Sequence, residues 1–209
     1  MATKRSAPAK RRYRSDRRAR QAAVTKRDVL DAATELFATQ GWSGTTLAAI
    51  AERAGVAVET VYSTYGSKKN LLRAALDVAI AGDAEPVPYA EREHFTGLAT
   101  GTLDERITRA ANVVADIYAR TAGVWRAAIE AAVGDPSVDE WRADAELRRR
   151  LDVARSAQAV LGHAVDDQTI DLLWVILSTE AYRSLTTDRG YSRDDYVALM
   201  EFAMRRVAL

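Results

Sequence analysis

Residues 45–68 decide the fold, and they read TTLAAIAERAGVAVETVYSTYGSK. In the first half of this stretch, apolar side chains recur at the i, i+3, i+4 and i+7 spacing of one helix face, at Leu47, Ile50, Ala51 and Ala54. We expect Thr45 to cap the start of this short helix, because a hydroxyl accepts from a free backbone amide there. Gly55 is expected to end it, because glycine readily adopts the left-handed conformation of a helix end.

A second apolar stripe follows, at Val58, Val61, Tyr62 and Tyr65. Two short helices that meet across a turn of three or four residues are typical of a helix-turn-helix. A helical hairpin packed for structural reasons alone has a similar pattern. The outward face of the second helix favours the helix-turn-helix, because its short polar side chains can reach base edges in the major groove.

The residues of this stretch divide into expected base readers and expected phosphate ligands. We assign base-edge contacts to Val58, Glu59, Thr60 and Ser63. The remaining DNA-binding set, in which phosphate contacts dominate, is Thr45, Thr46, Tyr62, Thr64 and Lys68. None of the base readers is Arg, Lys, Asn or Gln, so the strong bidentate contacts to guanine and adenine are missing.

With the residues around it, this stretch resembles the DNA-binding domain of the TetR family of one-component transcriptional regulators. The resemblance covers about residues 26–80 and rests on Leu36-Phe37, Gly41-Trp42, Thr45-Thr46, Ile50-Ala51, Ala54-Gly55-Val56, Tyr62, Tyr65 and Lys68. The chain departs from the family's pattern at Ala57 in place of a capping Ser, at Val58 in place of a polar or basic residue, and at Tyr65 in place of Phe. Because these departures lie in the recognition helix, the operator sequence does not follow from the resemblance.

Composition describes a globular protein of 209 residues, with 48% hydrophobic and 28% charged residues. No apolar run approaches the roughly 20 residues that span a bilayer, and no hydrophobic segment follows the basic N-terminus, so we expect a cytoplasmic protein without a secretory signal. The chain has no cysteine, and His94 and His163 have no metal-ligand spacing. We therefore expect no disulfide, no metal and no cofactor.

The net charge of +1 conceals a strongly basic amino terminus. Residues 1–27 contain eleven Lys or Arg and one Asp, a net +10, so the other 182 residues sum to −9. Residues 1–24 are poor in large apolar side chains, and we expect a disordered or partly helical arm. Such an arm can be a solubility tail or a cloning remnant. Its position ahead of a DNA-binding domain favours contact with DNA, through Arg12, Arg14, Arg17 and Arg18.

The remainder of the chain reads as helix throughout, which predicts an all-α fold of about nine helices. Residues 25–81 form the predicted DNA-binding domain, with the helix-turn-helix at about 46–65, a first helix that begins at a capping box at Thr25, and a lever helix from Lys68 to about Ile80. A Pro- and Gly-rich boundary follows. Residues 82–209 form a larger helical domain, in which breaks are expected at Gly123 and Pro136, with Ser137 capping the helix after Pro136.

Two late segments have more apolar surface than one small domain can cover, the helix that Asp166 or Asp167 opens and the one capped by Ser192. We expect a four-helix bundle across a two-fold axis, and the TetR resemblance implies the same dimer. The predicted interface residues are Leu173, Leu177, Leu185, Tyr196, Leu199, Met200 and Ala203.

The resemblance also implies a pocket for a small-molecule effector in the larger domain. Candidate walls are Tyr89, Phe95, Tyr118, Trp125, Trp141 and Trp174, with Glu130 or His94 as polar anchors. Each of these aromatic residues can equally belong to a packed core, because aromatic residues at helical spacing are common there.

The predicted function is a homodimeric repressor that binds a palindromic operator and is released by an effector. A constitutive or architectural DNA-binding dimer without a ligand is the main alternative, and a transcriptional activator is another. An apolar cavity in each protomer would favour the ligand-responsive protein, whereas a solid core would favour the architectural one. Enzymatic activity is not expected, since the sequence shows no nucleophile–base pair, phosphate-binding loop or metal cluster.

Overall fold

The structure is a computed structural model that describes residues 8–83 and 93–207, of which residues 8–19 and 93–94 are described by their backbone alone. Every regular element in these ranges is a helix, which confirms the all-α prediction, and the expectation of about nine helices is close. The long elements are α1 (Pro8–Gly44), α4 (Lys68–Ala81), α6 (Leu103–Ala132), α7 (Pro136–Leu161) and α10 (Arg193–Val207). The short ones are α2 (Leu47–Arg53), α3 (Val58–Tyr65), α5 (Glu93–Thr96), α8 (Asp167–Ile176) and α9 (Thr179–Arg183).

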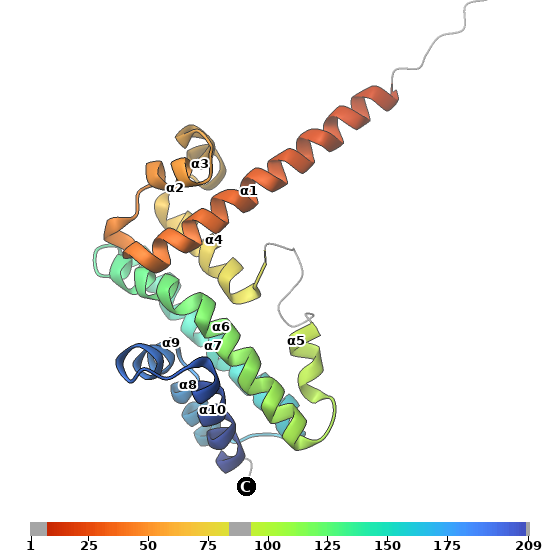
Figure 1. Cartoon of the computed structure of the whole chain (residues 1–209), viewed down its shortest axis with the longest axis vertical. Coiled ribbons are helices and arrows are strands. Elements are labelled where there is room, and N and C mark those ends of the chain that lie inside the picture. The colour runs from red at the N-terminus through yellow and green to blue at the C-terminus, as the bar shows by residue number, and fades with distance from the viewer. Residues whose placement is uncertain (1–7, 84–92, 208–209) are drawn as a thin grey trace, which may run out of the picture.

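Helix α1 begins far earlier than the sequence suggested. Its backbone is helical from Pro8, so Thr25 lies inside the helix and does not cap its start. Residues 8–24 are an extension of α1, so the helical alternative for the arm holds for the described backbone and the disordered one does not, and these residues lengthen the helix by about 25 Å. The composition explains this difference, because Ala and Arg are strong helix formers and no glycine interrupts the segment. In Figure 1 this end of α1 projects away from the other helices.

The predicted DNA-binding domain packs α1, α2, α3 and α4 around one apolar core. The carboxy-terminal part of α1 contributes Phe37, α2 contributes Ile50 and α3 contributes Val61, and each of these side chains is fully buried. Leu71 and Leu72 of α4 complete the core. Gly41 kinks the end of α1, where its φ of 70° is in the left-handed region, and the chain turns there toward α2.

Helix α6 joins the two domains, and it crosses α1 at Gly123. The sequence predicted a break at this glycine, but α6 continues through it without interruption. A Cβ at Gly123 would lie 2.8 Å from the Cα and Cβ of Ala38 on α1 and 2.9 Å from its carbonyl oxygen. The residue is glycine because the two backbones touch there, not because the helix ends.

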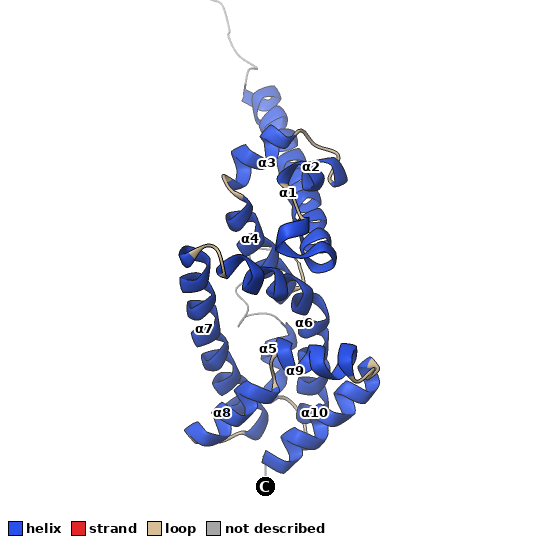
Figure 2. Ribbon diagram, turned by 90° about the vertical axis from the view of Figure 1, so that its left-hand side faces the viewer, coloured by secondary structure: helices blue, strands red, loops and turns tan. Residues whose placement is uncertain are grey.

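The larger domain places α7 beside α6 and covers their lower ends with α8 and α10 (Figure 2). The predicted helix starts at Asp166 and Ser192 are confirmed by the cap at Asp166 and the pairing of Ser192 with Asp195. Thr102 and Glu105 form a capping box at the start of α6, and Gly162 ends α7 in the left-handed conformation. Asp135 caps α7, with Pro136 in its first turn, so the prediction that Ser137 does so was wrong.

The apolar segment after Asp166 is two helices and not one. Helix α8 ends at Ile176, Leu177 leaves the helical conformation with ψ of 65°, and Ser178 starts α9 by accepting from the amide of Ala181 at 3.1 Å. This break leaves carbonyl groups at the end of α8 that the helix cannot satisfy. Their partners come from α6 and α7, as described below.

We expect Gly123→Ala to destabilise the protein. An alanine in place of glycine inside a helix ordinarily stabilises by about 1 kcal/mol, but here the added methyl group must push α1 and α6 apart, at a cost of about 1–3 kcal/mol. Thermal unfolding of this variant should therefore show a lower Tm. Gly134→Ala is the matched control, because no atom lies within 4 Å of its Cβ position. A Tm that rises in Gly123→Ala would contradict the close crossing.

Candidate functional site

The helix-turn-helix presents one polar face to solvent. Helix α3 carries Glu59, Tyr62, Ser63 and Thr64 on its exposed side, while Val61 is buried beneath them. Tyr62 is 54% exposed, so its phenol projects from this face and does not belong to the core. A helix with small polar side chains and one projecting phenol has the dimensions to enter a major groove.

Thr45 is not part of this face. Its side chain is fully buried, and its hydroxyl donates toward the carbonyl oxygens of Gly41 at 2.7 Å and Leu36 at 3.1 Å. The predictions that it caps α2 and that it binds DNA were therefore wrong. Thr46 is the cap of α2 and accepts from the amide of Ala49 at 3.0 Å. Thr46 is exposed and still has its own hydroxyl hydrogen to give to a phosphate.

The hydroxyls of α3 are oriented by their own helix. Ser63 and Thr64 donate to the carbonyl oxygen of Thr60, at 3.0 and 2.8 Å, which leaves their oxygen lone pairs facing outward as acceptors. Val58 is half-buried and packs against the core, so it has less reach toward DNA than the sequence suggested. Thr60 and Thr64 border a groove between α3 and α1, on the side of Lys26.

Lys68 braces the domain from the start of α4. Its ammonium donates to the carbonyl oxygen of Trp42 and lies 4.0 Å from the centre of the Trp42 ring. Partial burial lowers the pKa of Lys68. One of its three N–H groups is thus used within the protein, and two can reach a phosphate.

Glu130 supports the loop at Trp42, because it accepts from the Trp42 amide at 2.8 Å. It does not line the cavity, so its predicted role as a polar anchor of the effector pocket was wrong.

Two other cations near α3, Arg53 and Lys69, have acidic partners. Arg53 forms a two-pronged ion pair with Glu35, with a shortest distance of 2.6 Å. Lys69 reaches from α4 to the start of α7, where it contacts Asp135 at 3.1 Å and Ser137 at 2.8 Å. Hydrogen bonds from Ser137 and Lys69 lower the pKa of Asp135. The side chains of Arg12, Arg14, Arg17 and Arg18 lie outside the described residues.

A cavity of about 490 Å³ lies inside the larger domain. Helices α6 and α7 form its long walls, α8 and α10 contribute to it, and α4 of the DNA-binding domain supplies Leu76, Asp77, Ile80 and Ala81. A cavity of this size is in the range of small-molecule sites. Its wall therefore includes the helix that starts directly after α3.

Three of the predicted pocket residues meet in this cavity: Tyr118, Trp125 and Trp141. Phe95 instead packs beside the core of the larger domain, and Trp174 does not line the cavity but lies against the guanidinium of Arg149, 5.0 Å from its ring centre. Tyr89 and the side chain of His94 lie outside the described residues.

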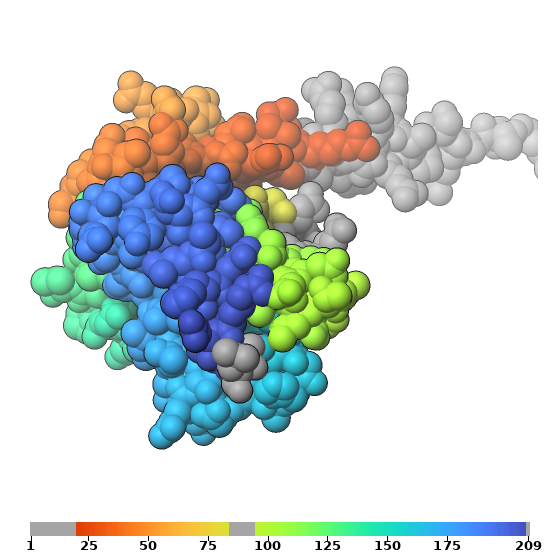
Figure 3. Space-filling model, turned by 60° about the horizontal axis from the view of Figure 1, so that its bottom comes forward, coloured from red at the N-terminus to blue at the C-terminus, as the bar shows by residue number. Residues whose placement is uncertain are grey.

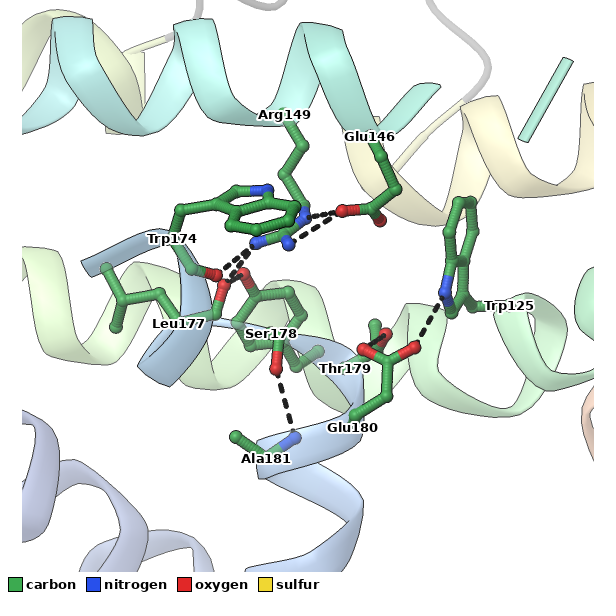
Figure 4. A network of polar contacts seen from close by, with 10 residues as sticks. Trp125, Glu146, Arg149, Trp174, Leu177, Ser178, Thr179, Glu180 and Ala181 are labelled. Atoms are coloured by element: carbon green, nitrogen blue, oxygen red, sulfur yellow. Dashed lines mark hydrogen bonds and ion pairs between the residues drawn. The ribbon is translucent and has the colours of Figure 1, made fainter. Parts of the chain in front are cut away.

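A polar network that the sequence did not reveal lines one end of the cavity (Figure 4). Arg149 donates to Glu146 at 2.7 Å and to the carbonyl oxygens of Trp174 and Leu177 at 2.9 and 2.6 Å, and Tyr118 donates to the same Leu177 oxygen. These donors satisfy the carbonyls left free by the break after α8. Trp125 completes the network by donating to Glu180 on α9 at 3.1 Å.

Burial and hydrogen bonding shift the pKa values of Tyr118 and Arg149 in this network. Burial raises the pKa of Tyr118 to about 12, so its hydroxyl stays a neutral donor at physiological pH. Burial opposes the charge of Arg149, but its hydrogen bond to Glu146 raises its pKa above the ordinary value. These roles were hard to predict, because the run of charges from 146 to 150 looks like a solvated helix face.

Much of the predicted dimer interface is used inside the protomer. Leu173, Leu177, Tyr196 and Met200 are buried in the core of the larger domain, so they cannot contact a partner in this structure. Leu185, Leu199 and Ala203 are half-buried. The large apolar side chains that α8 and α10 expose are Leu172, Val175 and Phe202, each more than half exposed. In Figure 3 the carboxy-terminal helices form one continuous surface.

Comparisons with known proteins agree with this arrangement. Residues 29–75 match the family model described as bacterial regulatory proteins, tetR family. A TetR-family transcriptional regulator from Rhodococcus sp. has a similar structure, with a TM-score of 0.68 and 19% identity over 90% of this chain and 100% of that one. A TetR-family regulator from Mesorhizobium loti gives a TM-score of 0.63 and 18% identity over 89% and 96% of the two chains. At these identities the likeness is one of fold.

A comparison with curated proteins found no match to the sequence. Within residues 8–83 and 93–207, no helix has the length and apolar character needed to cross a membrane. The same described ranges contain no cluster of three or more His, Asp or Glu side chains placed to hold a metal ion.

Thr45→Val and Thr46→Val should separate stability from DNA binding. Thr45→Val leaves two buried carbonyls without their donor, so we expect a loss of about 1–3 kcal/mol in the free energy of unfolding and an unchanged DNA affinity below the Tm. Thr46→Val removes an exposed cap and a phosphate donor, so it should cost about 1 kcal/mol and also weaken DNA binding. Denaturant unfolding and a DNA-binding titration measure both effects. An affinity loss confined to Thr45→Val would contradict this assignment.

Proposed function

We propose that this chain, a member of the tetR family of bacterial regulatory proteins, acts in the cytoplasm as a homodimeric repressor that a small molecule releases from its operator. DNA-binding transcription regulation is the activity common to the family. The observation that carries the proposal is the position of α4. It begins two residues after α3, and its other end forms a wall of the cavity. A ligand in the cavity therefore touches the helix to which the recognition helix is attached.

The cavity favours the proposed function over its main alternative. An architectural DNA-binding dimer needs only a packed core in its larger domain, whereas here about 490 Å³ remain open beside α4. A ligand shifts the protein toward a released form only if it binds that form better than the operator-bound form. Contact with α4 provides such a difference, because a change in the tilt of α4 changes both the cavity and the position of α3.

Operator recognition would combine weak contacts to base edges with strong electrostatic attraction to the DNA phosphates. The exposed side of α3 offers the carboxylate of Glu59 to a cytosine amine and hydroxyl groups to base edges, but no bidentate donor. Two copies of α3, related by a two-fold axis, would enter major grooves about one helical turn apart. Selection of bound DNA from a random pool should yield a near-palindrome with that spacing. Recovery of sequences without half-sites would argue for the architectural alternative.

The basic extension of α1 is the proposed source of much of the affinity. The chain carries a net +10 before residue 28 and −9 after it. Helix α1 passes beside α3, where Lys26 borders the same groove as Thr60 and Thr64, and the Tyr65 hydroxyl reaches the Lys26 carbonyl at 3.4 Å. DNA held by α3 therefore lies within the positive potential of α1.

Deletion of residues 1–20 should weaken operator binding and flatten its salt dependence. The deletion removes nine Lys or Arg, and every phosphate that the protein then fails to neutralise lowers the slope of log affinity against log salt by about 0.9. We expect affinity to fall at least tenfold and the slope to fall by several units for the dimer. The matched control replaces Arg12, Arg14, Arg17 and Arg18 by Lys, which keeps the charge and should keep the slope. An unchanged slope in the deletion would refute this role.

The exposed apolar residues of α8 and α10 are the proposed dimer contacts. A two-fold interface uses the same patch on both protomers, so a charge placed in it meets its own copy. We expect Val175→Glu or Phe202→Glu to raise the dimer dissociation constant by at least about tenfold, or 1.4 kcal/mol. Sedimentation equilibrium measures this. Leu147→Glu is the control, since Leu147 is equally apolar and exposed but lies on α7. Equal dimer dissociation constants in all three variants would show that the interface does not lie on α8 and α10.

A further inference from the structure

The cavity is long rather than compact. Its lining extends along α6 from Ala110 to Trp125 and along α7 from Trp141 to Leu161. Fifteen residues of helix span about 22 Å, which is the length of the cavity along α6. A volume of about 490 Å³ spread over that length leaves a narrow space. This shape suits an extended chain better than a rounded ring system.

The two ends of the cavity differ in polarity. The lower end is lined mainly by apolar side chains, with Ser156 as the polar exception: Leu98, Ala110, Val160, Leu161, Met204 and Val207. The upper end, nearest the DNA-binding domain, has the aromatic rings of Trp125 and Trp141 together with the polar network around Arg149. A ligand that fills the whole space must therefore have an apolar tail and a polar head.

The network leaves few free N–H donors for an anionic head group. Four of the five N–H groups of Arg149 are already used, two by Glu146 and two by the carbonyls of Trp174 and Leu177. Binding an anion there would break an ion pair that is itself about four-fifths buried. Arg148, the other cation of the lining, is exposed and lies close enough to influence both Asp77 and Asp152.

Two carboxylates of the cavity wall, one in the upper part and one near the middle, lack full partners. Asp77 lines the cavity from the exposed side of α4, where it makes no hydrogen bond or ion pair with any described residue and has only the longer-range attraction of Arg73 and Arg148. The bond from Arg120 to the Ala79 carbonyl, at 3.0 Å, places this part of α4 beside the upper half of α6. Asp152 faces the cavity from α7 and has only Arg155, at 3.4 Å, as an ion-pair partner among the described residues. Burial raises the pKa of both carboxyl groups, so an added cation would stabilise their charged forms.

We propose that the effector is an elongated cationic amphiphile, with an ammonium head beside Asp77 and an alkyl tail that extends toward Val160 and Met204. This inference rests on the proposed function, because it names the ligand class of the same cavity. The rings of Trp125 and Trp141 favour the same head, since aromatic faces attract cations. The head would bind to α4 itself, which gives the ligand direct contact with the helix that carries α3.

Alkyl probes test the proposal on the unmodified protein. Dodecylamine, dodecanol and dodecanoate share a tail and differ in head charge, and hexylamine has the same head on a shorter tail. Below their micelle concentrations, titration calorimetry should rank dodecylamine first and dodecanoate last. Each buried methylene should add about threefold to fourfold in affinity, so hexylamine should bind far more weakly than dodecylamine. Tighter binding of dodecanoate, or no dependence on tail length, would overturn the proposal.

Two substitutions locate the head and the tail. Asp77→Asn should weaken dodecylamine at least tenfold and leave dodecanol unchanged, whereas Asp144→Asn, an exposed change on α7 outside the cavity, should alter neither. Val207→Trp fills the lower end from the half-buried carboxy-terminal turn of α10, and it should weaken dodecylamine but not hexylamine. Equal effects of Asp77→Asn on dodecylamine and dodecanol would refute the head assignment.

Operator binding, measured on the same samples, keeps this inference separate from the proposed function. Dodecylamine that binds as expected but leaves the operator complex intact would refute release by the ligand and support the ligand class. A protein that binds its operator but none of the alkyl probes would refute the ligand class and leave DNA-binding regulation in place.

Discussion

The contact of α1 with α6 at Ala38 and Gly123 sets the geometry on which both sites depend. Two helices can approach this closely only where one lacks a side chain, and α6 lacks it at the level where α1 turns toward the helix-turn-helix. Arg126 donates to the Ala38 carbonyl at 3.3 Å, and Glu130 accepts from the Trp42 amide one turn further on. The DNA-binding domain is thus fixed to the same helix that forms a wall of the cavity. Because α1 is held there, α4 is the remaining connection through which the cavity can act on α3.

Local features of the fold were predictable from sequence, because they depend on neighbours a few residues away. The two short helices, the capping box at Thr102 and the cap at Asp166 follow from side-chain spacing alone. The roles of Thr45 and Gly123 were not predictable, since each is decided by a distant or non-adjacent contact: Thr45 by carbonyls of α1, and Gly123 by a backbone 85 positions away in the chain. From its neighbours in the sequence alone, a glycine in a helical pattern indicates a break. Once the helix packed against it is known, the same glycine indicates close packing of two backbones.

The same distinction holds for the candidate sites. The exposed polar face of α3 was predictable, because a short amphipathic helix has only one outward side. The cavity was predictable in its aromatic members Tyr118 and Trp125 but not in its charged ones. The side chains of Glu146 and Arg149 are about four-fifths buried because α8 ends beside them, and nothing near them in the chain indicates that break. Acidic and basic residues in a helical pattern are expected to be solvated. Here Arg149 is buried because it donates to free carbonyls of a segment that is distant in the sequence.

The ion pair of Lys69 with Asp135 gives α4 a mechanical pivot. It ties the start of α4 to the start of α7, so a turn of α4 about that point moves its two sides in opposite directions. The cavity residues Asp77 to Ala81 lie about 12–18 Å along α4 from this ion pair, on the side away from α3. A ligand that displaces this end of α4 would therefore also displace the recognition helix, in the opposite direction, as long as the ion pair holds.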